Sequence, residues 1–245
     1  MRHTTRTGWA VLAGAALGLG VFAPALAGDS NTVYIQQESP LGGIGNTIYV
    51  DQSAATGSNV GGFSTVPSLS ATPIASYPYS SSPLAFSANL AKPAQQLGGN
   101  NSARISDTGT DDMISLYQNN SQPGLSGSLN KATVTLSGNG AFGGVIQNGY
   151  ANVANLTVSG ALGTTTAGGI WQQGDHNTGT VNVSGGAAAL LVQNGSGNSN
   201  SLTATGPAGS QISYIVNGSN FTATGAQVTT NGAAVTITQS NAFSH

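Results

Sequence analysis

The sequence predicts an all-β protein, specifically a β-solenoid of stacked strand–arc–strand repeats. Three observations support this fold class. A short unit recurs along the chain, its strand segments alternate apolar and polar residues, and the segments between units vary in length. Tandem short units with variable returns are typical of solenoids, because each unit stacks on the one before it. Alternation with a period of two is typical of a half-buried strand and would not persist in a helix.

The recurring unit is clearest between Gln147 and Gly160, where a glutamine, a glycine and Asn152 precede an alternating segment. Six asparagines have a glycine eight residues later: Asn101, Asn130, Asn152, Asn177, Asn198 and Asn217. Glutamines precede the first five of them: Gln96, Gln118, Gln147, Gln172 and Gln193. We expect these amides to face inward and hydrogen-bond from turn to turn. Before Asn217, Ile212 and Tyr214 occupy the expected glutamine and glycine positions.

The motif Q-x-G-x-x-N-x-A resembles the curlin repeat of secreted subunits in bacterial curli amyloid fibres. Gln147, Gly149, Asn152 and Ala154 match it, as do four residues of 96–103. The resemblance covers 95–225 and a degenerate copy near 33–52. The second inward glutamine of the curlin unit is kept only at Gln52. The resemblance implies a divergent curlin-like amyloid subunit or nucleator that contributes to extracellular matrix, biofilm and surface adhesion.

The first 27 residues have the features of a secretory signal peptide. Arg2 and Arg6 supply positive charge, an apolar run follows over 9–22, and residues 25–27 form an A-x-A cleavage site. The apolar run is shorter than a membrane-spanning helix requires. We therefore expect a mature chain from residue 28 that is extracellular or on a bacterial cell surface, with no membrane span.

Three further segments follow the signal peptide. Residues 28–53 form an N-terminal repeat-like segment. Residues 54–94 are rich in serine and contain five prolines, which are excluded from central strands, so we predict a linker or covering loop. Residues 95–245 are predicted to contain the main run of solenoid repeats.

Two sets of residues are candidates for self-association. The first lies in the two end strands, which share one pattern and have a neighbour on one side only; it comprises Val33, Ile35, Gln37, Val235, Ile237 and Gln239. The second is an outward-facing apolar stripe that comprises Tyr117, Ile146, Trp171 and Val192. This stripe either mediates lateral association of fibres or adhesion, or is the surface on which residues 54–94 pack. Since unpaired sheet edges recruit further strands, we expect a head-to-tail polymer of this chain with itself.

The composition excludes several classes of function. Only 5% of the residues are charged, so there is no basic patch for nucleic acid. The chain has no cysteine, which excludes disulfides and thiolate metal sites. Asp111, Asp112, Asp175 and His176 are too few to predict a metal or catalytic site. We expect no enzyme activity and no cofactor.

A monomeric surface solenoid is the alternative. It would bind a polysaccharide or another repetitive surface through a threonine-rich face made of Thr133, Thr135, Thr157, Thr180, Thr203, Thr205, Thr222 and Thr224. The curlin resemblance instead implies a nucleating partner and an outer-membrane secretion apparatus. Self-assembly would favour the fibre subunit, whereas a persistent monomer that binds a ligand would favour the surface-binding solenoid.

Overall fold

The computed structural model describes residues 10–11, 26–27, 30–39, 45–64, 88–89, 91–120, 129–160 and 166–240. The first sheet contains β3 (Thr32–Glu38), β5 (Asn59–Phe63), β7 (Ala94–Gly98), β9 (Met113–Asn120), β11 (Phe142–Asn148), β13 (Ala167–Gln173), β15 (Ala188–Asn194), β17 (Gln211–Asn217) and β19 (Ala234–Ser240). The second contains β4 (Thr47–Gln52), β8 (Ser102–Asp107), β10 (Lys131–Ser137), β12 (Val153–Ser159), β14 (Thr178–Gly185), β16 (Ser199–Gly206) and β18 (Thr222–Thr229).

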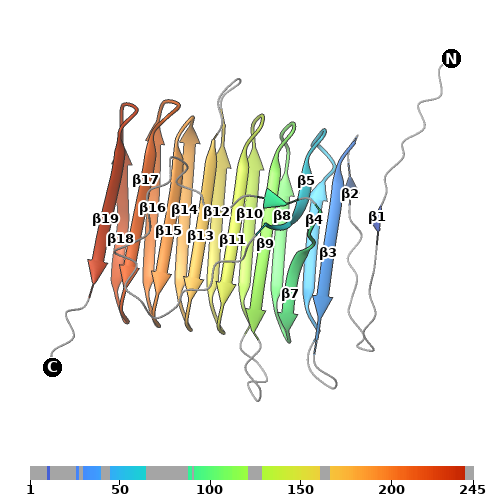
Figure 1. Ribbon diagram of the computed structural model, residues 1–245, viewed down its shortest axis with the longest axis horizontal. Helices are drawn as coiled ribbons and strands as arrows, with labels where there is room; N and C mark the ends of the chain where they lie inside the picture. The colour runs from blue at the N-terminus through green and yellow to red at the C-terminus, as the bar shows by residue number, and fades with distance from the viewer. Residues whose placement is uncertain are drawn as a thin grey trace.

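The chain passes from one sheet to the other and back, so each turn adds one strand to both sheets (Figure 1). Neighbouring turns pair in parallel, and the described residues contain no helix. The molecule is a β-solenoid of about seven turns, which confirms the predicted fold class.

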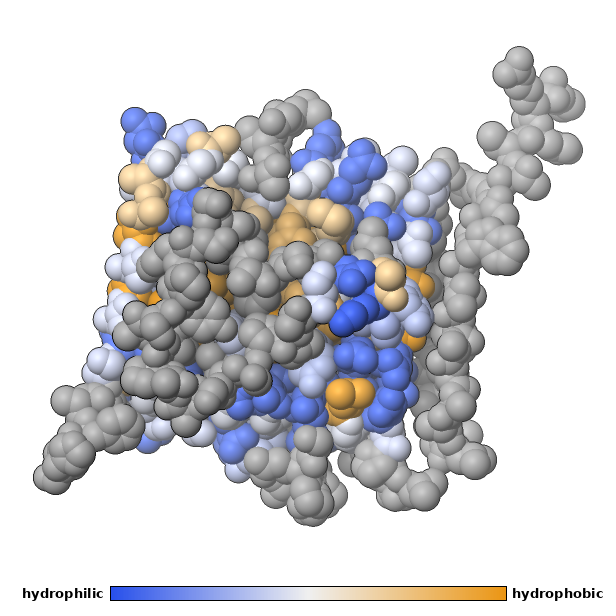
Figure 2. Space-filling view, viewed as in Figure 1, coloured by the Kyte–Doolittle hydropathy of each residue, from blue (hydrophilic) through white to orange (hydrophobic). Residues whose placement is uncertain are grey.

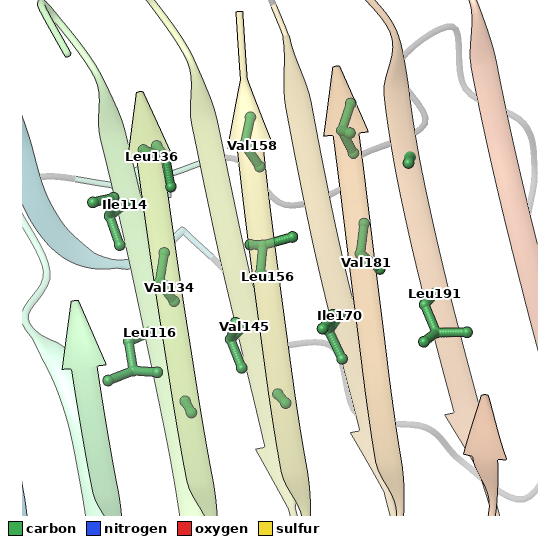
Figure 3. Packing of buried hydrophobic residues seen from close by; sticks show 14 of the residues in the cluster. Ile114, Leu116, Val134, Leu136, Val145, Leu156, Val158, Ile170, Val181 and Leu191 are labelled. Carbon is green, nitrogen blue, oxygen red and sulfur yellow. The ribbon is translucent and has the colours of Figure 1, made fainter. Parts of the chain in front are cut away.

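The core is a thin layer of aliphatic side chains between the two sheets. Register alignment stacks these side chains in columns, one of which contains Val134, Leu156, Val181 and Leu202. The facing sheet supplies a second column with Leu116, Val145, Ile170 and Leu191. Figure 3 shows members of both columns meeting between the sheets. Each strand therefore buries one face, as its alternating sequence requires.

One row of the first sheet is shared by two strands. β5 pairs with β3 and β9 over the first half of the row, and β7 pairs with them over the second half. The Gly62 amide donates to the Lys92 carbonyl at 2.8 Å, so the intervening segment leaves and rejoins the sheet at one point. β6 (Ala88–Asn89) lies on this segment and pairs antiparallel with β5.

This arrangement differs from the division expected at residues 54 and 94. Residues 59–63 are a strand of the solenoid, because the prolines from Pro67 onward follow β5 rather than interrupt it. The N-terminal repeat-like segment 28–53 belongs to the same solenoid, since β3 pairs with β7 and β4 pairs with β8. Residues 65–87, predicted as linker or covering loop, lie outside the described residues.

The two ends of the solenoid differ. At the N-terminal end, β1 (Ala10–Val11) pairs with β3, and β2 (Leu26–Ala27) pairs with β4. At the C-terminal end, β18 and β19 are the outermost described strands of their sheets. Because β19 has no following strand in the second sheet among the described residues, it forms a half turn.

Glycine allows the arcs to stack as closely as the strands. Gly174 has φ +106° and donates its amide to the Asn148 carbonyl at 2.9 Å. A Cβ at this position would lie 2.3 Å from the Gly195 carbonyl oxygen of the next arc. The arc therefore excludes a side chain both by its left-handed backbone and by the distance between turns.

We predict that Gly174→Ala destabilises the solenoid more than Gly140→Ala. Both glycines have positive φ, but a Cβ at Gly140 would meet nothing within 4 Å. Gly140→Ala should therefore show only the backbone cost of about 1–2 kcal/mol, whereas the clash at Gly174 should add about 1–3 kcal/mol. Chemical denaturation measures the free energy of unfolding of both variants. Equal losses would mean that the distance between arcs does not exclude a side chain at Gly174.

Candidate functional site: the amide ladders and the solenoid ends

A ladder of glutamine side chains runs along the inside of the solenoid. Up to Gln172, each Nε2 donates to the Oε1 of the glutamine in the next turn at 2.6–2.9 Å. The six members are Gln37, Gln96, Gln118, Gln147, Gln172 and Gln193. All except Gln37 are fully buried. Burial of these amides is tolerated because each turn supplies the partner that water would otherwise provide.

The same glutamines also join the two sheets. Gln172 Nε2 donates to the Val153 carbonyl at 2.9 Å, and Gln193 Nε2 donates to the Thr178 carbonyl at 2.9 Å. These carbonyls belong to strands of the second sheet. In the members from Gln96 to Gln172, each amide group therefore donates both along the stack and across it.

Asparagines form a second column at the arcs that enter the second sheet. The Asn152 Oδ1 accepts from the Asn177 amide at 3.0 Å, and its Nδ2 donates to the Gly174 carbonyl at 2.7 Å. The members of this column are Asn46, Asn101, Asn130, Asn152, Asn177 and Asn198. Asn46 was missing from the sequence-based set, although its position before an alternating segment was a usable signal.

Asn217 does not belong to this column, which corrects the sequence-based alignment of the last complete turn. Asn217 pairs with Asn194, Val216 occupies the glutamine position, and Phe221 occupies the asparagine position, where its amide donates to Asn198 Oδ1 at 3.0 Å. The error arose because this turn retains neither the glutamine nor the asparagine that defines the spacing.

A relay of hydrogen bonds continues the ladder past Val216. Gln193 Nε2 donates to Asn200 Oδ1 at 2.9 Å, and Asn200 Nδ2 donates to the Tyr214 hydroxyl at 3.4 Å. That hydroxyl donates to Gln239 Oε1 at 2.7 Å. Burial raises the pKa of Tyr214, so its hydroxyl remains a donor at neutral pH. Every bond from Gln37 to Gln239 therefore points toward the C-terminal end.

The polarity of this relay makes the two ends different. No described residue donates to Gln37 Oε1 at the N-terminal end. No described residue accepts from Gln239 Nε2 at the C-terminal end. Val235 and Ile237 beside Gln239 are half-buried, and Figure 2 shows hydrophobic surface at this end of the solenoid. The ends thus present an unused acceptor, an unused donor and partly uncovered apolar columns.

The apolar stripe faces outward as expected but is not an open surface. Ile146 is 0% exposed, Trp171 2% and Val192 3%, while Tyr117 is half-buried. Phe63 packs in one cluster with Ile146 and Trp171. The proposed self-association through this stripe is therefore corrected, because these side chains are already covered in the folded chain. Phe63 belongs to the predicted segment 54–94, which supports the interpretation that this segment packs on the stripe.

The ionisable residues of the arcs have structural partners. Asp175 Oδ1 accepts from the Tyr150 amide at 3.0 Å, and His176 packs edge-on against the Tyr150 ring at a centroid distance of 4.9 Å. The described residues contain no group of three or more His, Cys, Asp or Glu side chains placed to hold a metal ion. No helix within this described part could cross a membrane.

No protein-family model matches the sequence, and comparisons with curated proteins and with solved structures gave no match. The resemblance to the curlin repeat accordingly rests on the motif residues themselves.

We predict that Gln147→Leu lowers the free energy of unfolding by about 1–3 kcal/mol. The variant leaves Gln118 Nε2 and Gln172 Oε1 without their ladder partners. Asn155→Gln is the matched control, because Asn155 is half-exposed on the outer face of β12 and should tolerate the change. Chemical denaturation compares the two variants, and equal losses would show that the ladder does not stabilise the fold.

Phe63→Ala should expose part of the cluster on the outer face of the first sheet. Trp171 is the only tryptophan after residue 27, so its emission reports on this cluster once residues 1–27 are removed. We expect a red shift of emission and a loss of about 3–5 kcal/mol, as for other large-to-small core changes. An unchanged emission maximum would mean that Phe63 does not cover Trp171.

Proposed function

We propose that the chain is a secreted subunit that polymerises head to tail into amyloid-like fibres of the extracellular matrix. The observation that supports this most strongly is the one-directional hydrogen-bond relay from Gln37 to Gln239. A second copy placed end to end would bring Gln239 Nε2 against Gln37 Oε1 and continue the relay. A contact between unlike ends does not close, so it generates fibres rather than rings.

The backbone of the first sheet would continue across the same junction. Val33, Ile35 and Gln37 alternate on β3 with the spacing that Val235, Ile237 and Gln239 have on β19. Stacking β19 of one copy on β3 of the next would pair the exposed edges of the first sheet and align its inward columns. The second sheet would lack one strand between β18 and the β4 of the next copy, because β19 forms a half turn. Open edges with matching patterns favour this kind of association.

Removal of the predicted signal peptide would open the acceptor edge. β1 and β2 lie within residues 1–27 and pair with β3 and β4. Cleavage after Ala27 would remove both strands and leave these edges free. Export and polymerisation would then be linked, since the chain gains its N-terminal docking edge only on processing. A nucleator and an outer-membrane secretion apparatus are the partners that the curlin resemblance implies for this route.

The outer face of the second sheet favours a second candidate function, binding to a repetitive polysaccharide. Its polar side chains stand in aligned rows, one of which contains Thr135, Thr157, Asn182 and Thr203. These side chains are exposed or half-exposed. Such a flat array of hydroxyls and amides suits a repetitive hydroxylated surface. In a polymer the array would lengthen with the fibre, so binding could accompany assembly as adhesion.

A disulfide cross-link tests the proposed register, because the natural chain has no cysteine. Gln36 and Thr238 neighbour Gln37 and Gln239, and Thr238 is exposed. In a chain starting at residue 28, Gln36→Cys with Thr238→Cys should form intermolecular disulfides within thioflavin-positive fibres, since paired strands bring Cα atoms within disulfide reach. The control pair Gln36→Cys with Thr135→Cys should not cross-link.

The outcomes separate the two candidate functions. Cross-linked ladders of molecules, with a cross-β reflection near 4.7–4.8 Å, would support head-to-tail assembly. A chain ending at Gly232 lacks β19 and should elongate far more slowly. A protein that remains monomeric when seeded but sediments with insoluble polysaccharide would favour the binding function and contradict the polymer.

A further inference from the structure

A pair of buried carboxyl groups lies where the first turns of the solenoid stack on the rest. Asp107 ends β8 and is 1% exposed, and Asp112 precedes β9 and is 0% exposed. The arc between them packs against the β4–β5 arc, since Thr56 N donates to the Gly109 carbonyl at 3.0 Å and Asp112 N donates to Ser58 Oγ at 3.2 Å. The pair therefore sits inside a junction between successive turns.

Each carboxyl group uses one oxygen in a bond to the backbone. Asp107 Oδ1 accepts from the Gly109 amide at 3.0 Å, and Asp112 Oδ1 accepts from the Ala141 amide at 2.6 Å. The two Oδ2 atoms accept from no N–H group of the described residues. The two carboxyl groups meet at Gly109, whose amide donates to Asp107 Oδ1 and where an added Cβ would lie 1.9 Å from Asp112 Oδ2. Two facing acceptors become a bonded pair when one of them carries a proton.

No positively charged side chain of the described residues faces the pair. The charged residues on the surrounding β4, β8, β9 arc and β10 are Asp51, Arg104, Asp111 and Lys131. Asp51, Arg104 and Lys131 alternate to the outer face, and Asp111 is exposed and adds negative charge. β5 carries no charged residue. Two like charges in this setting would both be desolvated and repel each other.

Gln52 is the remaining polar group beside the pair. Its neighbour Asp51 pairs with Ser106, which places Gln52 next to Asp107 in the inward column. Gln52 is 0% exposed, and neither atom of its amide has a partner among the described residues. Among the described residues, the buried junction thus contains two carboxyl groups, a neutral amide and the Ser58 hydroxyl, with no cationic side chain.

We infer that Asp112 keeps its proton in the folded chain and donates it to Asp107, and that this hydrogen bond fastens the first turns to the rest of the solenoid. The bond gives the two carboxyl groups a partner that the backbone does not supply. Loss of the proton leaves two buried carboxylates with only neutral partners nearby, the Gln52 amide and the Ser58 hydroxyl. Ionisation would therefore weaken the junction between the β4–β5 and β8–β9 arcs.

The direction of the pH effect follows from the pKa. Burial, together with the negative charge of Asp107 and Asp111, raises the pKa of Asp112 from 3.8 to about 7. The folded chain then holds a proton that the unfolded chain releases above pH 4. Stability should therefore fall as pH rises from about 4 to about 7 and level off above that range. An ordinary carboxyl pair would give the opposite trend.

The test compares the full chain with Asp112→Asn and Asp111→Asn. Thermal unfolding from pH 4.5 to 8.5 should show a fall in Tm of at least about 5 °C for the wild type. Asp112→Asn keeps a donor toward Asp107 without titrating, so most of this fall should disappear. The control Asp111→Asn changes an exposed neighbour and should retain it. Infrared spectroscopy at pH 6 should show a protonated carboxyl band that Asp112→Asn removes.

Three results would overturn the inference. The first is an unchanged pH dependence in Asp112→Asn. The second is a wild-type protonated carboxyl band that vanishes near pH 4 instead of near pH 7, a measurement that holds even if the variant does not fold. The third is calcium chloride restoring the wild-type Tm at pH 8.5 but not that of Asp107→Asn, which would make the pair a cation site.

Discussion

The structure depends on hydrogen bonds between buried amides in successive turns. A glutamine inside this thin core has no water to bond, so from Gln37 to Gln172 its partner is the glutamine one turn away. That requirement fixes the register of the strands that carry these glutamines, because a slip by one residue would turn the amides outward. It also requires the arcs to stack at the spacing of the strands, which explains why an arc position such as Gly174 cannot carry a side chain.

The same dependence leaves the ends of the solenoid incomplete. Inside the stack each glutamine has a neighbour on both sides, whereas Gln37 and Gln239 each have one. Because the side-chain donors of the glutamine relay all point toward the C-terminal end, the two ends need each other rather than copies of themselves. The proposed polymer is the arrangement in which no ladder amide lacks a partner except at the fibre tips. The interior carboxyl pair adds a point within the stack whose bonding depends on a proton.

Much of the fold could be predicted because the motif and its alternation repeat over many turns. Four of the inward glutamines followed from their position five residues before an asparagine, and the structure has them hydrogen-bonded in line. The last turn was misaligned, since Val216 and Phe221 replace the two marker residues. β5 was missed because the prolines that follow it dominate the composition of 54–94. The contact between Asp107 and Asp112 depends on how two arcs stack, which no local pattern encodes.

Hydrogen exchange of side-chain amides, followed by NMR on isotopically labelled protein, tests the ladder most directly. The account predicts that the Nε2 protons of Gln96, Gln118, Gln147, Gln172 and Gln193 exchange far more slowly than those of Gln227, which is exposed on β18. The exchange protection of these side-chain amides should reach that of the backbone amides in the central strands, since both kinds of hydrogen bond open only when turns separate. Ladder amides that exchange as fast as Gln227 would contradict the account.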